Sequence, residues 1–123
     1  MDFNGREMTA IIKLAKAMVL VDGEIDRMEV NVMSIESLRF GIQPENFQKL
    51  LAASNQMSSK EAFGLVSDMS LEKKKYVTAY LGVIIAADGE IDDKELALWK
   101  LVTALCDLPE MTIDVALDYL ANM

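Results

Sequence analysis

The chain has 123 residues, of which 52% are hydrophobic, with two prolines, one cysteine and no histidine. This length and composition exclude a disordered chain and predict one folded domain over residues 1–123, with a core that needs no disulfide. The formal net charge of −8 excludes nucleic acid as a partner, because nucleic-acid binding needs clustered Lys and Arg, and it favours a cation or a basic protein surface.

Apolar residues recur at helical spacing along the whole chain, so the sequence predicts an all-α fold of seven helices. The first helix is expected at about residues 5–21, with Asn4 and Glu7 as a capping box at its start. The residues expected on its core face are Met8, Ile11, Ala15, Met18 and Val19. A second helix is expected at about residues 27–40.

Two further helices are expected before the middle of the chain. The third begins after Pro44 and carries Phe47, Leu50 and Leu51. The fourth is short, at about residues 59–67, and Ser58 and Glu61 form its capping box.

The fifth helix is expected from the residue after Ser70 to Ala87, and it is apolar on nearly every side, which places it at the centre of the fold. The sixth is expected at about residues 93–106 and the seventh after Thr112. The residues expected to face inward on the sixth helix are Leu98, Leu101, Val102 and Leu105. Those expected to be buried on the seventh are Ile113, Ala116, Leu117 and Leu120.

An acidic turn occurs twice, because residues 22–29 and 88–95 share the pattern Asp-Gly-Glu-Ile-Asp-x-x-Glu at a displacement of 66 positions. The flanking helices correspond as well, which divides the chain into halves at about 5–54 and 71–122. The short helix at about 59–67 joins these halves. The sequence therefore predicts a compact domain with an internal pseudo-two-fold repeat.

Helix capping explains much of each turn. In the second copy, Gly89 suits the left-handed position that ends a helix, Asp92 suits an N-cap, and Glu95 completes a capping box. In the first copy, Gly23, Asp26 and Glu29 fill these roles.

Capping does not explain Asp22 and Asp88, since each carboxylate lies where a helix ends and the helix dipole is negative. A bound cation, a basic side chain from elsewhere in the fold, or exposure to water would each relieve this repulsion. A complete EF-hand loop is excluded, because Met18 and Leu20 would occupy its first two ligand positions. What remains is an incomplete oxygen site, or two half-sites that complete one another.

The duplicated turn, the motif from Ala87 to Asp92 and the Leu108-Pro109 link resemble the TerB-like (tellurite-resistance) family over nearly the whole chain. The resemblance implies a compact helical fold with a pseudo-two-fold and an acidic surface proposed to bind a divalent metal. It also implies a bacterial cytoplasmic setting, tied to stress response or complex assembly. The positions that carry over as metal ligands are Asp22, Asp26, Glu29, Asp88, Asp92 and Glu95. The first copy departs from the motif at Val21, where the second has Ala87.

Two functions are compatible with these patterns. In one, the chain is a non-enzymatic interaction or stress-response module whose acidic turns bind Ca²⁺, Mg²⁺ or Mn²⁺, the cations that all-oxygen ligands suit. In the other, it is a protein–protein scaffold whose turns serve only as caps and whose acidic face docks a basic partner. A metal-dependent hydrolase is disfavoured, because the chain has no histidine to act as a base.

The remaining signals concern location. The longest apolar run, from Ala79 to Ala87, is far shorter than the ~20 residues of a membrane-spanning helix, so no membrane span is expected. The single Cys106 indicates a reducing cytoplasm, and we expect it to be a small core residue rather than a nucleophile.

Overall fold

The computed structural model describes residues 2–20, 27–39, 42–87, 89 and 91–123, and these form seven α-helices and no strand. The helices are α1 (Gly5–Leu20), α2 (Arg27–Arg39), α3 (Pro44–Gln56), α4 (Ser59–Ser67), α5 (Leu71–Ile85), α6 (Asp93–Leu105) and α7 (Ile113–Ala121). The predicted all-α fold is therefore confirmed for the described part of the chain. None of the helices described there is both long enough and apolar enough to cross a membrane.

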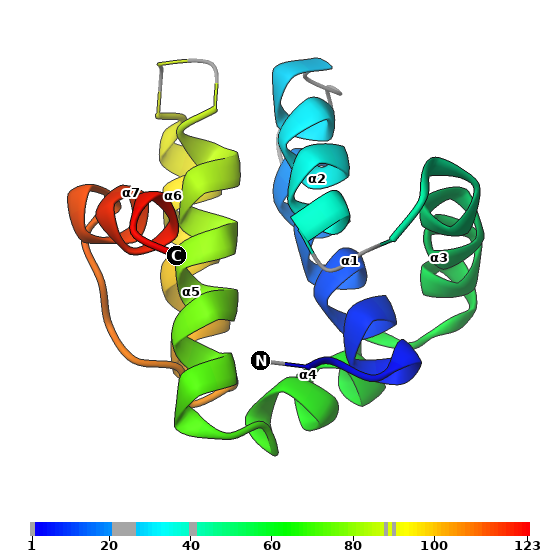
Figure 1. Ribbon diagram of the computed structural model, residues 1–123. Helices are drawn as coiled ribbons and strands as arrows, with labels where there is room; N and C mark the ends of the chain where they lie inside the picture. The colour runs from blue at the N-terminus through cyan, green and yellow to red at the C-terminus, as the bar shows by residue number, and fades with distance from the viewer. Residues whose placement is uncertain (1, 21–26, 40–41, 88, 90) are drawn as a thin grey trace.

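The central helices are α1 and α5, which pack against each other. α1 also packs against α3 and α4, and α5 packs against α7 and α2. In Figure 1, α7 lies across α5 on one side of the molecule, α3 lies beside α1 on the other, and α4 runs beneath them. Every residue from Tyr76 to Gly82 is buried, as are Ile84 and Ile85, so the predicted central position of the fifth helix is confirmed.

The observed helix ends differ from the predicted ones by at most two residues, and local residue types explain the differences. All five residues expected on the core face of the first helix are buried. α3 begins at Pro44 itself, since the fixed φ of proline and its missing N–H suit the first position of a helix. α5 ends at Ile85 rather than Ala87, because the N–H groups of Ala86 and Ala87 donate to carbonyls three residues back, in turns tighter than an α-helix.

The inward face of α6 differs from the predicted one. Leu101 and Leu105 are each 54% exposed, whereas Trp99 and Cys106 are buried. The Trp99 indole N–H donates to the Thr78 carbonyl of α5 at 3.0 Å, so the largest side chain of α6 fixes which side of the helix faces the core. The prediction that Leu101 and Leu105 point inward is therefore wrong.

The seventh helix shows a smaller error of the same kind. Ala116 and Leu120 are buried as expected and Ile113 is half-buried, but Leu117 is exposed. α7 is short and packs against α5 (Figure 1), so only a narrow stripe of its side chains, Ala116 and Leu120, is buried in the core.

Gly82 allows α5, α6 and α7 to approach one another. A Cβ atom at this position would lie 2.7 Å from Cζ2 of Trp99 and 3.0 Å from Cβ of Ala116. The absence of a side chain at Gly82 thus makes room for the Trp99 indole.

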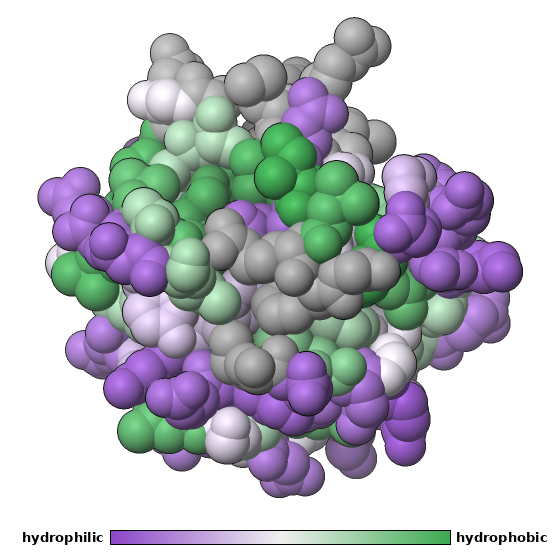
Figure 2. All heavy atoms as spheres, in the orientation of Figure 1, coloured by the Kyte–Doolittle hydropathy of each residue, from purple (hydrophilic) through white to green (hydrophobic). Residues whose placement is uncertain are grey.

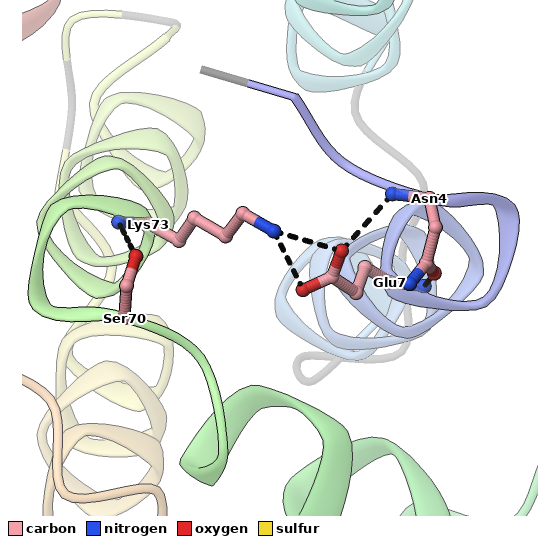
Figure 3. A network of polar contacts seen from close by, with 4 residues as sticks. All are labelled: Asn4, Glu7, Ser70 and Lys73. Carbon is pink, nitrogen blue, oxygen red and sulfur yellow. Dashed lines mark hydrogen bonds and ion pairs between the residues drawn. The ribbon is translucent and has the colours of Figure 1, made fainter.

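The N-terminal ends of α1 and α5 meet in a set of polar contacts that we call the cap junction: Asn4, Glu7, Ser70 and Lys73 (Figure 3). The Asn4 side chain accepts from the Glu7 N–H at 2.8 Å, and the Glu7 carboxylate accepts from the Asn4 N–H at 3.0 Å, which confirms the predicted capping box. The Ser70 hydroxyl accepts from the Lys73 N–H at 3.3 Å. The Lys73 ammonium then reaches both Glu7 carboxylate oxygens, at 3.0 and 3.1 Å.

Candidate functional site

The six predicted metal ligands divide into those that the structure describes and those that it does not. Asp22, Asp26 and Asp88 lie outside the described residues, and so does the side chain of Glu29 in α2. The side chains of Asp92 and Glu95 are described, and both lie at the start of α6.

Asp92 is the N-cap of α6. Its backbone is extended, and its Oδ1 accepts hydrogen bonds from the N–H groups of Lys94 at 2.8 Å and Glu95 at 3.2 Å. These N–H groups have no carbonyl partner within the helix, so the aspartate satisfies two donors that would otherwise lack one. The predicted cap is confirmed here.

Glu95 is the third residue of α6 and is only 5% exposed. A carboxylate in the first turn of a helix is stabilised by the positive end of the helix dipole, which repels a cation at the same place. Asp92 Oδ1 is engaged by backbone N–H groups, so capping accounts for this residue without a metal ion. Among the residues that the structure describes, no three His, Cys, Asp or Glu side chains form a group that could hold a metal ion.

Gly89 also follows the capping prediction. Gly89 has a φ of +83°, a left-handed value that favours glycine, and its N–H donates to the Ala86 carbonyl at 3.1 Å. The described ends of the helices that flank both acidic turns lie at one end of the molecule, at the top of Figure 1: the C-terminal ends of α1 and α5 and the N-terminal ends of α2 and α6.

A buried carboxylate that no sequence pattern predicted lies between α2 and α5. Glu36 is buried, and the Tyr76 hydroxyl donates to its Oε2 at 3.3 Å. Burial, and secondly the charge of Glu36, raise the pKa of Tyr80. The space beside these groups has a volume of only about 10 Å³, so it has no room for a substrate. The sequence signal for its burial is spacing: Glu36 lies one helical turn after the apolar Met33, and both residues are buried.

Cys106 is fully buried, as predicted for a core residue. Burial raises the pKa of its thiol, although a hydrogen bond with Ser67 and the charge of Lys74 oppose this effect. A protonated, inaccessible thiol is a poor nucleophile.

A groove lies between the C-terminal half of α6 and the segment that follows it. Its volume is about 440 Å³, and its lining includes buried Trp99, Thr103 and Leu108 together with exposed Asp107 and Glu110. Asp107 has a φ of +52°, a left-handed value that turns the chain at the end of α6. No pattern in the sequence predicted this groove, because it depends on the turn at Asp107.

No family model matches the chain, and no curated protein matches it. A crystal structure of a protein of unknown function, PG1108 from Porphyromonas gingivalis W83, is similar to it with a TM-score of 0.90 and 50% sequence identity. The similarity covers 100% of this chain and 99% of that one.

Proposed function

We propose that this protein is a non-enzymatic protein-interaction module whose acidic turns serve as helix caps. The chain belongs to the same family as PG1108 of Porphyromonas gingivalis. The observation that carries this proposal is the Asp92 side chain, which accepts from two backbone N–H groups of α6. An acidic residue that caps a helix has a structural reason to be there, and it needs no ligand to explain it.

The titratable groups away from the turns support a role without catalysis. Cys106 is buried with a raised thiol pKa, and Glu36 lies beside Tyr76 with almost no free space around it. Catalysis by either group would require access to a substrate. The groove at α6 is lined by Trp99, Leu108 and Met111 and by charged residues at its surface, and this combination suits the binding of a partner's side chain.

The proposed architecture includes the internal pseudo-two-fold repeat. Two observations support it. α1 contacts α2, α3 and α6, while α5 contacts α6, α7 and α2, which is the exchange of partners that a two-fold would produce. The cap junction also pairs positions 66 apart: Asn4 and Ser70 are both N-cap residues, and Glu7 and Lys73 bind each other. Residues beside a two-fold axis meet their own equivalents in this way.

We also propose that the chain is a member of the TerB-like family. The support for this proposal is the duplicated acidic motif on an all-helical chain with Asp92 and Glu95 at the start of α6. A role in bacterial stress response or complex assembly, in the cytoplasm, follows from that resemblance. Tellurite itself is an unsuitable ligand for the turns, because an oxyanion is repelled by carboxylates.

Cation binding by the acidic turns is the second candidate function. It is favoured by one observation, that the helix ends flanking both turns lie at the same end of the molecule (Figure 1). Two half-sites brought to one end could share a Ca²⁺, Mg²⁺ or Mn²⁺ ion through carboxylate oxygens. Asp22 and Asp88 would be its main ligands.

Substitution of Asp92 tests the capping role. Asp92→Ala removes the cap and is expected to lower the free energy of unfolding by about 0.5–2 kcal/mol. Asp92→Asn is the matched control, because asparagine caps a helix as well as aspartate does but carries no charge. We expect Asp92→Asn to retain wild-type stability in urea unfolding.

Thermal unfolding with EDTA or with millimolar Ca²⁺, Mg²⁺ or Mn²⁺ completes the test. Capping alone predicts that no cation moves the melting temperature of the wild type. Cation binding predicts a stabilisation of about 2.7 kcal/mol at a hundredfold excess over Kd. The double variant Asp22→Asn, Asp88→Asn would abolish that gain. A clear cation-dependent shift that this variant removes would replace the capping proposal with the second candidate.

A further inference from the structure

α6 carries a second apolar stripe on the side turned away from the core. Its members are exposed and follow the spacing i, i+4, i+7 and i+8: Ala97, Leu101, Ala104 and Leu105. This spacing is the one by which an amphipathic helix packs against a neighbour. The opposite side of α6, which carries Trp99, is buried against α5. The exposed stripe is therefore a second apolar face that does not pack against the core.

The groove beside α6 adjoins this stripe, since Ala104 belongs to both. Trp99 and Leu108, which are buried, and Met111, which is half-buried, give it apolar walls. A volume of about 440 Å³ is within the range of binding pockets, roughly 300–1,000 Å³, and accepts a large apolar side chain. The stripe and the groove together form a continuous surface, which we call the α6 surface.

The charge around the α6 surface is mainly negative. Residues 101–123 contain Asp107, Glu110, Asp114 and Asp118, all exposed, and no Lys or Arg. Lys100 is the basic residue in the groove lining, and the Lys74 ammonium lies 3.7 Å from the Asp107 carboxylate, which is itself 96% exposed. A partner with Lys or Arg beside an apolar stripe would match this surface in both charge and hydrophobicity.

A second copy of the chain fits the α6 surface less well than a basic partner does, and the apolar area over α2 is a less suitable docking surface. A second copy of the chain would bring the same carboxylates face to face, at a cost in like-charge repulsion. Figure 2 shows that apolar side chains also gather over α2 and the upper part of α5, and Ile35 and Leu38 of α2 are exposed. The sequences of α2 and α6 each hold two basic and two acidic residues, so the helices themselves do not differ in net charge. The α6 surface adds Asp107 and Glu110 in its groove, and these carboxylates favour a basic partner there.

We infer that the α6 surface docks a basic amphipathic helix of a partner protein, with a large apolar side chain in the groove and Lys or Arg against Asp107 and Glu110. The inference rests on the proposed function as an interaction module, and it adds the surface and the chemistry of the partner. It concerns described residues that have no part in the acidic turns.

Trp99 provides the readout, since it is the single tryptophan of the chain and lies in the groove wall. The probe is a synthetic amphipathic helix of leucine and lysine about five turns long. We expect it to change the Trp99 fluorescence in a saturable titration that weakens as salt is added. The controls are a scrambled peptide of the same composition and an amphipathic peptide with glutamate in place of lysine.

Variants locate the binding. The double variant Leu101→Gln, Leu105→Gln is expected to weaken binding by about tenfold or more, since both leucines are apolar anchors. Ile35→Gln is the matched control: Ile35 lies 66 positions before Leu101, on α2, and is 63% exposed. It should leave the affinity unchanged. The double variant Asp107→Asn, Glu110→Gln should weaken binding and flatten its salt dependence.

Several outcomes would overturn the inference. They are no binding of the leucine–lysine peptide, equal binding of the scrambled or acidic peptide, and a loss of binding with Ile35→Gln as large as with the leucine variants. Self-association that Leu101→Gln removes in analytical ultracentrifugation would assign the surface to a second copy. None of these results alters the Asp92→Asn and cation experiments, so a failure here is distinguishable from a failure of the proposed function.

Discussion

At the cap junction, the Lys73 ammonium meets the Glu7 carboxylate within hydrogen-bond distance, and the two side chains are only 24% and 12% exposed. On the α6 surface, by contrast, Asp107 and Glu110 are exposed beside Leu101 and Leu105. The first region therefore satisfies its charges within the chain, while the second presents both charge and apolar area to the solvent. This difference separates residues that hold the fold together from residues available to a partner.

The cap junction also brings together two positions that are equivalent in the proposed repeat. Glu7 and Lys73 occupy positions 66 apart, each three residues after an N-cap. Two carboxylates at these positions would repel each other, because the side chains meet across the contact between α1 and α5. Because Lys73 occupies the second of these positions, the contact with Glu7 is an ion pair.

The largest effect on stability is expected beside the cap junction, at Tyr76. This residue is buried and its ring lies 5.6 Å from Phe3 and 5.7 Å from Tyr80, measured between ring centroids. Tyr76→Ala should lower the free energy of unfolding by about 3–5 kcal/mol, the usual cost of removing a buried aromatic ring. Tyr76→Phe keeps the ring and loses the hydrogen bond to Glu36, so its cost should be smaller. Equal costs for the two variants in urea unfolding would contradict this.

A pH-dependent loss of stability is expected from Tyr80. Its pKa is raised in the folded protein, so the folded state holds the hydroxyl proton more tightly than the unfolded state does. The resulting stability is fully present below the unfolded value of about 10 and is lost as the pH rises above it. Tyr80→Phe should show a shallower decline in alkaline urea unfolding. An unchanged alkaline decline in this variant would assign the effect to other groups.

The coupling between Glu7 and Lys73 should be smaller again. A double-mutant cycle with Glu7→Gln and Lys73→Met is expected to give a coupling energy of about 0.5–3 kcal/mol, since the pair is largely buried. The exposed pair of Arg6 and Glu61, at 2.8 Å, is the matched control, and a surface pair is worth about 0–1 kcal/mol. A coupling no larger than that of the control would remove the distinction between the cap junction and an ordinary surface pair.

The smallest effect is expected on the α6 surface. Leu101→Gln and Leu105→Gln should each change the free energy of unfolding by no more than about 0.5 kcal/mol, as is usual for exposed positions away from structural contacts. A loss of several kcal/mol in urea unfolding would show that the stripe contributes to the fold.

Local signals in the sequence were sufficient for much of the fold. The capping box of Asn4 and Glu7, the N-cap at Asp92 and the left-handed Gly89 depend on residues a few positions apart, and all three are as predicted. Ser58 likewise accepts from the Glu61 N–H at 3.1 Å. Such contacts form within one turn of chain, so the residue types alone identify them.

Features that depend on tertiary packing could not be predicted in the same way. α6 has apolar residues on both sides, so periodicity could not show that Trp99, rather than Leu101 and Leu105, faces α5. The choice depends on the space that Gly82 leaves for the indole, which lies in another helix. The groove depends in turn on a left-handed backbone at Asp107, where the residue type permits but does not require it. The predicted metal site remains a prediction, because four of its six side chains lie outside the described part of the structure.

Hydrogen–deuterium exchange with and without the leucine–lysine peptide tests the contrast between the two regions most directly. We expect slower exchange over the C-terminal half of α6 and residues 107–111, with no change at the start of α1 and α5. Slower exchange confined to α2, or spread evenly over all helices, would contradict the assignment of the α6 surface as the docking site.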